Sequence, residues 1–306
     1  MSSGDSSPSS DIRIQILRRS NVRMRDPVLV QEKINKIISE GAQSLQVITD
    51  YDLTLTKQHV NGELTLSSFG LLSLYKHLPP GFPAAEKANK EKYYPIELDL
   101  NLTNEEKTPH MIEWYRESEK LLTGIYYDRE ELRKVISKSG PELRDGTVEF
   151  CKLLEKNHIP VLVLSAGQGN VLAEVLSYHG LSENEYFHIV SNFFKIENGT
   201  VTGYGCHENG LFIHPFNKNG FGCTSYFQKL GNSRRNVVLM GDSLGDANMD
   251  QGVPEISTVL KIGYLYGKAN YIEESLPKYQ NLFDIVLIDD QTMDVPREIL
   301  KPLFIS

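Results

Sequence analysis

Four short apolar segments, each rich in valine and isoleucine, constrain the fold of this 306-residue chain more than any other feature. Each segment ends abruptly in small or polar residues, which is typical of strands buried inside a parallel sheet. We expect a fifth strand at residues 283–289. The four segments are residues 45–49 (LQVIT), 160–165 (PVLVLS), 188–192 (HIVSN) and 236–241 (NVVLMG).

Helical patterns alternate with these strands. Apolar residues recur at helical intervals from Asp26 to about Ser39, with Pro27 suited to a first turn. Residues 148–157 and 170–180 also read as helices. Alternating strands and helices predict an α/β fold with a Rossmann-like parallel sheet.

Residues 57–143 break this alternation, because they read as several helices in succession, notably 110–122 and 128–139. We therefore expect an inserted all-helical domain at 57–143, within a core formed by residues 11–56 and 144–306. Residues 1–10 are rich in serine with glycine and proline, and we expect them to be disordered.

Composition excludes several classes of partner. The formal charge is −8 with no basic tract, which argues against a nucleic-acid polymer as partner. No segment is apolar enough for a signal peptide or a membrane span, so we expect a cytoplasmic protein with no membrane partner. We also expect a monomer. Three cysteines without metal-type spacing favour reduced thiols over a zinc site.

The strongest chemical signal follows the first predicted strand, where the sequence reads Asp50-x-Asp52-x-Thr54. Ligands of open α/β sheets bind at the carboxyl ends of strands. Two carboxylates there repel each other unless a cation or hydrogen-bond donors compensate. Asp242 and Asp246 follow the strand at 236–241 and supply more oxygen ligands. Such a set suits Mg²⁺.

Two further elements complete the pattern. Ser165 closes a predicted strand and precedes glycines at the start of a helix, where main-chain N–H groups can receive phosphate oxygens. Lys218 lies in a polar loop, residues 214–220. An isolated D-x-D is usually a turn or a solvated pair. Here, however, three of the four elements lie at carboxyl ends of predicted strands in one chain, which favours a shared site over coincidence.

In this order, the four motifs resemble those of the haloacid dehalogenase superfamily of phosphatases. From about residue 24 to the end, the chain is most similar to the cytosolic 5′-nucleotidase III family, which acts on pyrimidine and 7-methylguanosine monophosphates. The resemblance implies that the insert is a cap that closes over the substrate. The segments that carry it are residues 93–99, 110–118, 164–172, 188–193, 216–219, 241–249 and 260–265.

The resemblance implies a nucleophile and an acid–base. Asp50 would attack phosphorus and form an aspartyl-phosphate. Asp52 would protonate the leaving 5′-oxygen and then accept a proton from the attacking water. Mg²⁺ would be bound by Asp50, the main-chain carbonyl of Asp52 and Asp242, while Asp246 would orient the metal shell and Lys218.

The resemblance also implies substrate contacts. Ser165, the Ala166 amide and Lys218 would bind the phosphoryl oxygens that are not transferred. Glu97 and Ser118 would recognise the base.

Three aromatic residues are candidates for stacking on the base. For Phe69 and Tyr115 both interpretations stay open, stacking on the base and packing in the core. Trp114 is expected to pack instead, because adjacent helical residues do not share a face.

Substrate preference and alternative functions stay open. The methylguanosine-preferring branch of the family commonly reads E-W-W where this chain reads Glu113-Trp114-Tyr115, yet residues 67–70 and 289–296 resemble invertebrate members of that branch. One alternative is a phosphatase of the same superfamily that acts on a sugar phosphate or phosphoserine. Another is a receiver-like phospho-acceptor module, although such a module needs no helical insert.

Overall fold

The computed structural model describes residues 15–99, 101–205, 212–218 and 224–304. The predicted disordered segment at residues 1–10 lies outside the described residues, as do Cys206 and Cys223. Cys151 is a buried free cysteine. None of the described helices combines the length and apolar character that crossing a membrane requires.

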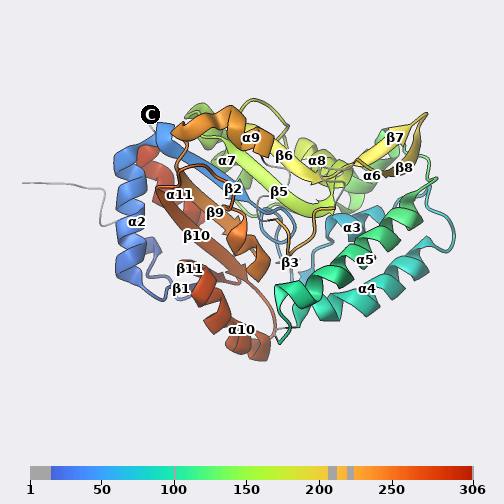
Figure 1. Ribbon diagram of the computed structural model, residues 1–306, viewed down its shortest axis with the longest axis horizontal. Coiled ribbons are helices and arrows are strands. Elements are labelled where there is room, and N and C mark those ends of the chain that lie inside the picture. The colour runs from blue at the N-terminus through green and yellow to red at the C-terminus, as the bar shows by residue number, and fades with distance from the viewer. Residues whose placement is uncertain (1–14, 100, 206–211, 219–223, 305–306) are drawn as a thin grey trace, which may run out of the picture.

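The centre of the molecule is a seven-stranded sheet in the order β1-β11-β10-β9-β2-β5-β6 (Figure 1). Neighbouring strands are parallel, except that β1 runs antiparallel to β11. The five predicted strands are confirmed, whereas β10 and the short β1 were not predicted. The strands are β1 (Val22–Arg23), β2 (Leu45–Thr49), β5 (Val161–Gln168), β6 (Phe187–Asn192), β9 (Asn236–Gly241), β10 (Thr258–Leu265) and β11 (Ile285–Ile288).

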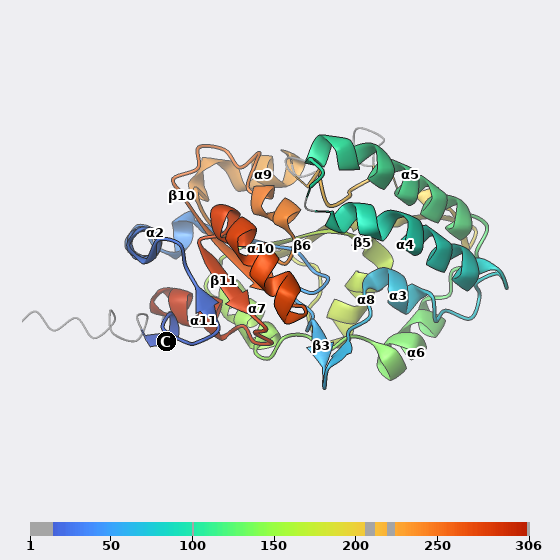
Figure 2. The same cartoon turned by 90° about the horizontal axis from the view of Figure 1, so that it is seen from below.

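Helices cover both faces of this sheet. Successive strand residues point to opposite sides, and apolar residues on both sides pack against helices. Val47 and Val238 belong to a hydrophobic cluster with α2, α7, α8 and α11, while Ile48 and Leu239 belong to one with α9 and α10. Figure 2 shows α9 and α10 on one side of the sheet and α7 and α11 on the other. These helices are α2 (Pro27–Glu40), α7 (Thr147–Lys156), α8 (Gly169–Tyr178), α9 (Thr224–Leu230), α10 (Ala269–Leu282) and α11 (Asp294–Leu300). Short 3-10 turns are η1 (Ala42–Ser44), η2 (Gly231–Ser233), η3 (Leu244–Asn248) and η4 (Lys301–Leu303).

The described part of the chain between β2 and α7 contains four helices, of which α4 and α5 lie side by side (Figures 1 and 2). The helices expected at 110–122 and 128–139 are confirmed, although the first begins earlier, at a capping box formed by Thr103 and Glu106. The four are α3 (Ser68–Leu72), α4 (Phe82–Leu98), α5 (Asn104–Leu122) and α6 (Arg129–Ser139).

Two hairpins were not expected. β3 (His59–Val60) and β4 (Glu63–Leu64) form one inside the segment expected to be all-helical, and β7 (Phe194–Glu197) and β8 (Thr200–Tyr204) form the other. Both turns are Asn-Gly pairs with positive φ angles, 53° and 84° in the first and 50° and 77° in the second. Two successive positive φ angles match the tight turn that Asn-Gly favours.

The β7–β8 hairpin packs against the chain that links α5 to α6. The main-chain N–H of Gly124 donates to the Val201 carbonyl at 2.8 Å, and that of Tyr127 donates to the Gly199 carbonyl at 2.8 Å. A segment that follows β6 therefore supports the end of the insert.

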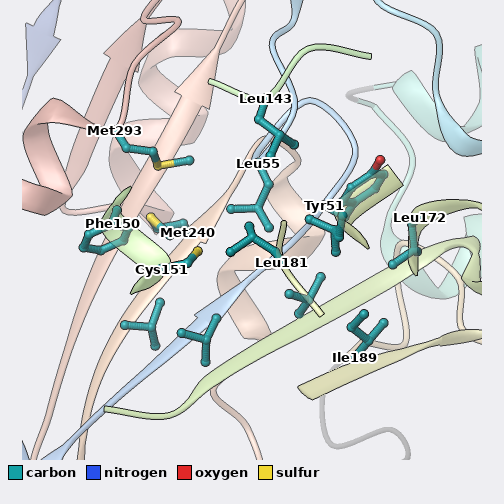
Figure 3. Packing of buried hydrophobic residues seen from close by; sticks show 14 of the residues in the cluster. Tyr51, Leu55, Leu143, Phe150, Cys151, Leu172, Leu181, Ile189, Met240 and Met293 are labelled. Atoms are coloured by element: carbon teal, nitrogen blue, oxygen red, sulfur yellow. The ribbon is translucent and has the colours of Figure 1, made fainter. Parts of the chain in front are cut away.

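The hydrophobic core extends directly beneath the D-x-D-x-T loop. Tyr51 and Leu55 are each 1% exposed and belong to the same buried cluster as Leu143 and Leu172 (Figure 3). Because Tyr51 is anchored in the core, its neighbours on either side are held at a fixed position at the tip of β2. The loop is thus built on packed side chains rather than on solvent-exposed turns.

Candidate active site

Asp50 and Asp242 follow two adjacent parallel strands, β2 and β9. The N–H of Asp50 donates to the Met240 carbonyl at 3.0 Å, so the strand ladder continues up to Asp50 itself. β2 lies between β9 and β5. After β2 the chain first adds β5 and β6 on one side of it and then adds β9, β10 and β11 on the other side. Open α/β sheets bind ligands at such a switch point, at the carboxyl ends of the strands.

Lys218 connects the acidic residues. Its Nζ donates to Oδ1 of Asp246 at 2.7 Å and also forms a short contact with Oδ1 of Asp50. The side chain of Lys218 is only 5% exposed. Burial alone would lower the pKa of this ammonium, but the charges and hydrogen bonds of Asp246 and Asp50 raise it above its ordinary value. Lys218 is therefore a fixed, buried cation.

Asp246 is held by the turn that follows β9. Its Oδ2 accepts hydrogen bonds from the N–H groups of Asp242 (3.1 Å) and Ser243 (2.9 Å), which leaves Oδ1 for Lys218. A Cβ on Gly241 would lie 2.3 Å from the Cβ of Asp246, so only glycine permits this close approach. Glycine at position 241 is thus required by the geometry of the turn.

Asp50, Asp242 and Asp246 form an acidic cluster in which one oxygen of each residue lies within 4.8 Å of those of the others. Burial, opposed by Lys218 and reinforced by the charge of Asp246, raises the pKa of Asp50 to about 7. Burial followed by the charges of Asp50 and Asp246 raises the pKa of Asp242 well above its ordinary value. If all three carboxylates are ionised, they carry more negative charge than Lys218 offsets, and their hard oxygen donors fit Mg²⁺.

Asp52 points to a different partner, Ser68 of α3. The N–H of Ser68 donates to Oδ1 of Asp52 at 2.8 Å, and its hydroxyl donates to Oδ2 at 2.8 Å. Burial raises the pKa of Asp52, while these two hydrogen bonds oppose the shift. Ser68 was not identified as a site residue from the sequence.

Ser165 lies at a bulge in β5. The pairing of β5 with β6 shifts register between Leu164 and Gln168, and the N–H of Gly167 donates to the Ser165 hydroxyl at 3.0 Å. α8 begins directly afterwards, at Gly169, as expected. Bulges of this kind redirect main-chain groups next to active sites.

Ala166 is fixed from two sides. Its carbonyl accepts hydrogen bonds from the Tyr115 hydroxyl and from Nδ2 of Asn192, both at 2.9 Å. Tyr115 belongs to α5, so this hydrogen bond joins the insert to the Ser165–Ala166 segment.

Tyr115 is 6% exposed and lies among other rings. Phe69 meets it edge-on with ring centres 5.9 Å apart, and Phe212 lies nearly parallel to it at 6.4 Å. The prediction that Trp114 packs is confirmed, since it stacks on Tyr93 of α4 at 5.8 Å. Ser118 is 8% exposed and lies on the same buried face of α5 as Tyr115.

Glu97 lies near the end of α4, where its carbonyl accepts a hydrogen bond from Nζ of Lys107 at 2.9 Å. Burial raises the pKa of the Glu97 carboxyl to about 7, although the charge of Lys218 lowers it and that of Asp246 raises it. The carboxyl is therefore close enough to the acidic cluster to be influenced by both charges.

A cavity of about 250 Å³ opens beside Lys218, between the start of α5 and the loops that follow β9 and precede α9. A larger cavity of about 420 Å³ lies between α6 and α8, away from the acidic cluster. We assign the chemistry to the smaller cavity, because the titratable groups with perturbed pKa values converge beside it. It is lined by Asn104, Glu105, Thr108, Phe216, Lys218, Gly245 and Asn248.

Arg144 is a second residue that the sequence did not reveal. It is 1% exposed, and its guanidinium donates to the carbonyls of Thr54 at 2.6 Å, Leu53 at 2.5 Å and Asp290. Leu53 has a φ of 61°, a left-handed conformation that costs a residue other than glycine about 1–3 kcal/mol. Arg144 thus holds the loop that follows Asp52 in a strained conformation.

An acidic cluster with a buried lysine at the switch point of a parallel α/β sheet, beneath inserted helices, is the arrangement expected of a phosphatase of the haloacid dehalogenase superfamily. A model of the family described as pyrimidine 5′-nucleotidase (UMPH-1) matches residues 53–304, and the chain belongs to this family. The resemblance to cytosolic 5′-nucleotidase III is thereby confirmed, and the protein is an enzyme that hydrolyses nucleoside 5′-monophosphates.

Individual relatives cover nearly the whole chain. The 7-methylguanosine phosphate-specific 5′-nucleotidase of Drosophila melanogaster is 39% identical over 94% of this chain and 89% of its own length. The human enzyme of the same name is 36% identical over 94% of both chains. The crystal structure of cytosolic 5′-nucleotidase IIIB bound to cytidine superposes with a TM-score of 0.88 at 38% identity, covering 95% of this chain and 96% of that one.

Proposed function

We propose that the enzyme hydrolyses 7-methyl-GMP and the pyrimidine nucleotides CMP and UMP with Mg²⁺, through an aspartyl-phosphate on Asp50. The observation that carries this proposal is the contact of the buried Lys218 with both Asp50 and Asp246, beside Asp242. A carboxylate at a strand tip, next to a fixed cation, can attack a phosphoryl group that the cation binds, which supports the proposal.

In the first step, an oxygen of Asp50 forms a bond to phosphorus while the bond from phosphorus to the 5′-oxygen breaks. Asp52 gives its proton to the departing oxygen. In the second step, a water oxygen attacks phosphorus, the bond to Asp50 breaks, and Asp52 accepts a proton of that water. The enzyme returns to its starting protonation state after each turnover.

Asp50, Asp242 and the main-chain carbonyl of Asp52 would hold Mg²⁺, with Asp246 fixing the turn and Lys218. When bound, the ion offsets the repulsion between the Asp50 carboxylate and the phosphate dianion.

Lys218, the Ser165 hydroxyl and the Ala166 amide would bind the oxygens that stay on phosphorus. The bulge at Ser165 and the hydrogen bonds to the Ala166 carbonyl support this role, because they fix the main chain there. Prepositioned donors of this kind are the main requirement of phosphoryl transfer.

Recognition of the nucleoside would fall to residues 57–143, acting as a cap domain. Glu97 and Ser118 would contact the base, and Phe69 and Tyr115 would form the aromatic wall. The half-buried position of Glu97, close enough to the acidic cluster to be influenced by its charges, supports its role, because a carboxylate there can accept hydrogen bonds from a base edge.

The choice of substrates draws on the relatives. The family model is described as a pyrimidine 5′-nucleotidase, the fly and human relatives are named for 7-methylguanosine phosphate, and the solved relative holds cytidine. We also propose a cytoplasmic monomer, in keeping with a Caenorhabditis elegans relative named as a putative cytosolic 5′-nucleotidase. Light scattering of the purified protein tests the monomer.

A substrate panel tests the proposal. Phosphate release is measured from 7-methyl-GMP, CMP, UMP, phosphoserine and a sugar phosphate, with Mg²⁺, after chelation and after Mg²⁺ is restored. We expect release from the nucleotides alone, lost on chelation and recovered on restoration. Comparable release from phosphoserine or the sugar phosphate, or full activity after chelation, would contradict the proposal.

A further inference from the structure

We propose that Ser68 is a positioning residue that holds the Asp52 carboxyl in place for both proton transfers. The inserted helix α3 then contributes to the chemistry itself, in addition to any contact of the insert with the base. This inference rests on the proposed function, because it assumes that Asp52 is the acid and base.

Ser68 engages both oxygens of Asp52. Its N–H reaches Oδ1 and its hydroxyl reaches Oδ2, each at 2.8 Å, so the carboxyl plane is fixed by two donors from one residue. Each carboxyl oxygen keeps a second lone pair, which is free for the transferred proton. A fixed carboxyl matters because proton transfer requires hydrogen-bond geometry to the reacting oxygen.

The direction of the serine hydroxyl is set by a third partner. The N–H of Gln168 donates to the Ser68 oxygen at 3.1 Å, so this oxygen is an acceptor there and its single proton is left for Asp52. Ser68 is 2% exposed and Gln168 is fully buried. Water therefore has little access to this hydroxyl, and its partners are those of the protein.

Gly167 makes this arrangement possible. A Cβ at position 167 would lie 2.2 Å from the Ser68 oxygen, 2.8 Å from Oδ2 of Asp52 and 3.2 Å from the Ser165 oxygen. The three oxygens thus converge over one glycine. The insert, through Ser68, meets the D-x-D loop and the Ser165 segment at a single point.

The experiment compares a graded series, Ser68→Cys and Ser68→Ala, with Ser67→Ala as the matched control. Ser67 is the adjacent N-cap of α3, and its side chain accepts from the Gly70 N–H rather than contacting Asp52. Ser67→Ala removes one hydrogen bond at this helix start, whereas Ser68→Ala removes two, the donation to Asp52 and the acceptance from the Gln168 N–H. A thiol resembles a hydroxyl in shape but is a weaker donor, so Ser68→Cys separates donation from packing.

We expect kcat for UMP to fall by about 10- to 100-fold in Ser68→Ala, with a smaller loss in Ser68→Cys and KM nearly unchanged in both. With 4-nitrophenyl phosphate the leaving group needs no proton. The pre-steady-state burst of nitrophenolate should therefore keep its rate while the steady-state phase slows. Ser67→Ala should keep both phases at wild-type rates. A purely structural role for Ser68 would not separate the two phases.

Asp52→Asn distinguishes the two levels of the argument. Suppose that Asp52→Asn loses turnover. The inference on Ser68 is then wrong, and the proposed function stands, if Ser68→Ala shows any of three results: an unchanged kcat, a rise in KM alone, or equal slowing of the burst and the steady-state phase. If Asp52→Asn itself keeps wild-type turnover, the proposed function is wrong. Should Ser68→Ala not fold, Ser68→Cys decides, since wild-type kinetics in that folded variant would overturn the inference.

Discussion

Lys218 and Asp246 form a buried ion pair in which Nζ lies 2.7 Å from Oδ1, while the other oxygen of Asp246 is used by two main-chain N–H groups. Asp246 is therefore a fixed anchor and Lys218 a fixed cation, which also contacts Asp50. A cation held in this way needs little reorganisation when a phosphoryl group arrives, which favours catalysis.

Lys218→Met is expected to lower kcat by more than about 100-fold, because the phosphoryl oxygens lose a buried cation. It should also lower the unfolding temperature of the metal-free protein, since Asp50 and Asp246 lose their shared partner. Steady-state kinetics and thermal unfolding measure both effects. Lys229→Met, an exposed lysine of α9, serves as control. Unchanged turnover in Lys218→Met would contradict this role.

Asp50→Asn is expected to abolish turnover, by more than about a thousandfold, while the fold is retained. The amide has nearly the shape of the carboxyl but cannot form the acyl phosphate, and it relieves repulsion within the acidic cluster. Phosphate release and circular dichroism check the two parts. Wild-type-like activity in this variant would remove Asp50 as nucleophile.

Stability should depend on pH when metal is absent. Burial raises the pKa of Asp50 from 3.8 to about 7, so between these values the native protein keeps a proton that the unfolded chain has released. The free energy of unfolding therefore falls as pH rises through this range. Unfolding temperatures in chelator at about pH 5 and about pH 8 measure the decline. We expect the decline to be smaller when Mg²⁺ is present and in the variant Asp50→Asn. An equal decline in the metal-free wild type, the wild type with Mg²⁺ and Asp50→Asn would show that Asp50 is not the source of the pH dependence.

Glu97→Ala is expected to lower kcat/KM for CMP and UMP by about 10- to 100-fold and to affect 4-nitrophenyl phosphate far less. The small aryl phosphate has no nucleobase for Glu97 to bind. Glu91→Ala provides the control, because Glu91 is an exposed residue of the same helix that pairs only loosely with Lys87, at 3.7 Å. Equal losses on nucleotide and aryl phosphate would exclude Glu97 from base recognition.

Arg144→Lys is expected to lower the free energy of unfolding by about 3 kcal/mol, because a lysine cannot reproduce the planar fork of hydrogen bonds to main-chain carbonyls. Turnover should fall too, since Leu53 would relax from its left-handed conformation and carry Asp52 with it. Denaturant unfolding and kinetics measure the change, with the exposed Arg25→Lys as control. If Arg144→Lys unfolds and turns over like the wild type, Arg144 does not hold the loop.

The sheet could be predicted because its strands are short apolar runs, but β10 escaped. Lys261 interrupts the apolar run of β10, and in the structure its Nζ reaches Oδ1 of Asp250 at 2.9 Å instead of disrupting the strand. The two hairpins carried a usable signal, Asn61-Gly62 and Asn198-Gly199, that marks tight turns. Without that signal β3 and β4 are too short to be noticed, at two residues each, and β7 lacks an apolar run because three of its four residues are exposed.

The site residues divide in a similar way. Asp50, Asp242 and Asp246 could be placed together because carboxyl ends of parallel strands meet at one edge of the sheet. Lys218, which lies in a loop, joined them only through the resemblance to the phosphatase superfamily. Ser68 could not, since its contact with Asp52 depends on how α3 packs against the core, which no local pattern encodes.

Arg144 was hidden for a related reason. Its partners are the main-chain carbonyls of residues 53, 54 and 290, which are distant in sequence from it and leave no mark on side-chain composition.

The central claim, that Asp50 becomes phosphorylated, is tested most directly by mapping the covalent intermediate. Asp52→Asn is mixed with 4-nitrophenyl phosphate and Mg²⁺, quenched in acid, digested and analysed by mass spectrometry, with the double variant Asp50→Asn/Asp52→Asn in parallel. We predict a phosphoryl adduct on the peptide that contains Asp50, absent from the double variant. An adduct on another residue, or nitrophenolate release by Asp52→Asn without any adduct, would contradict the account.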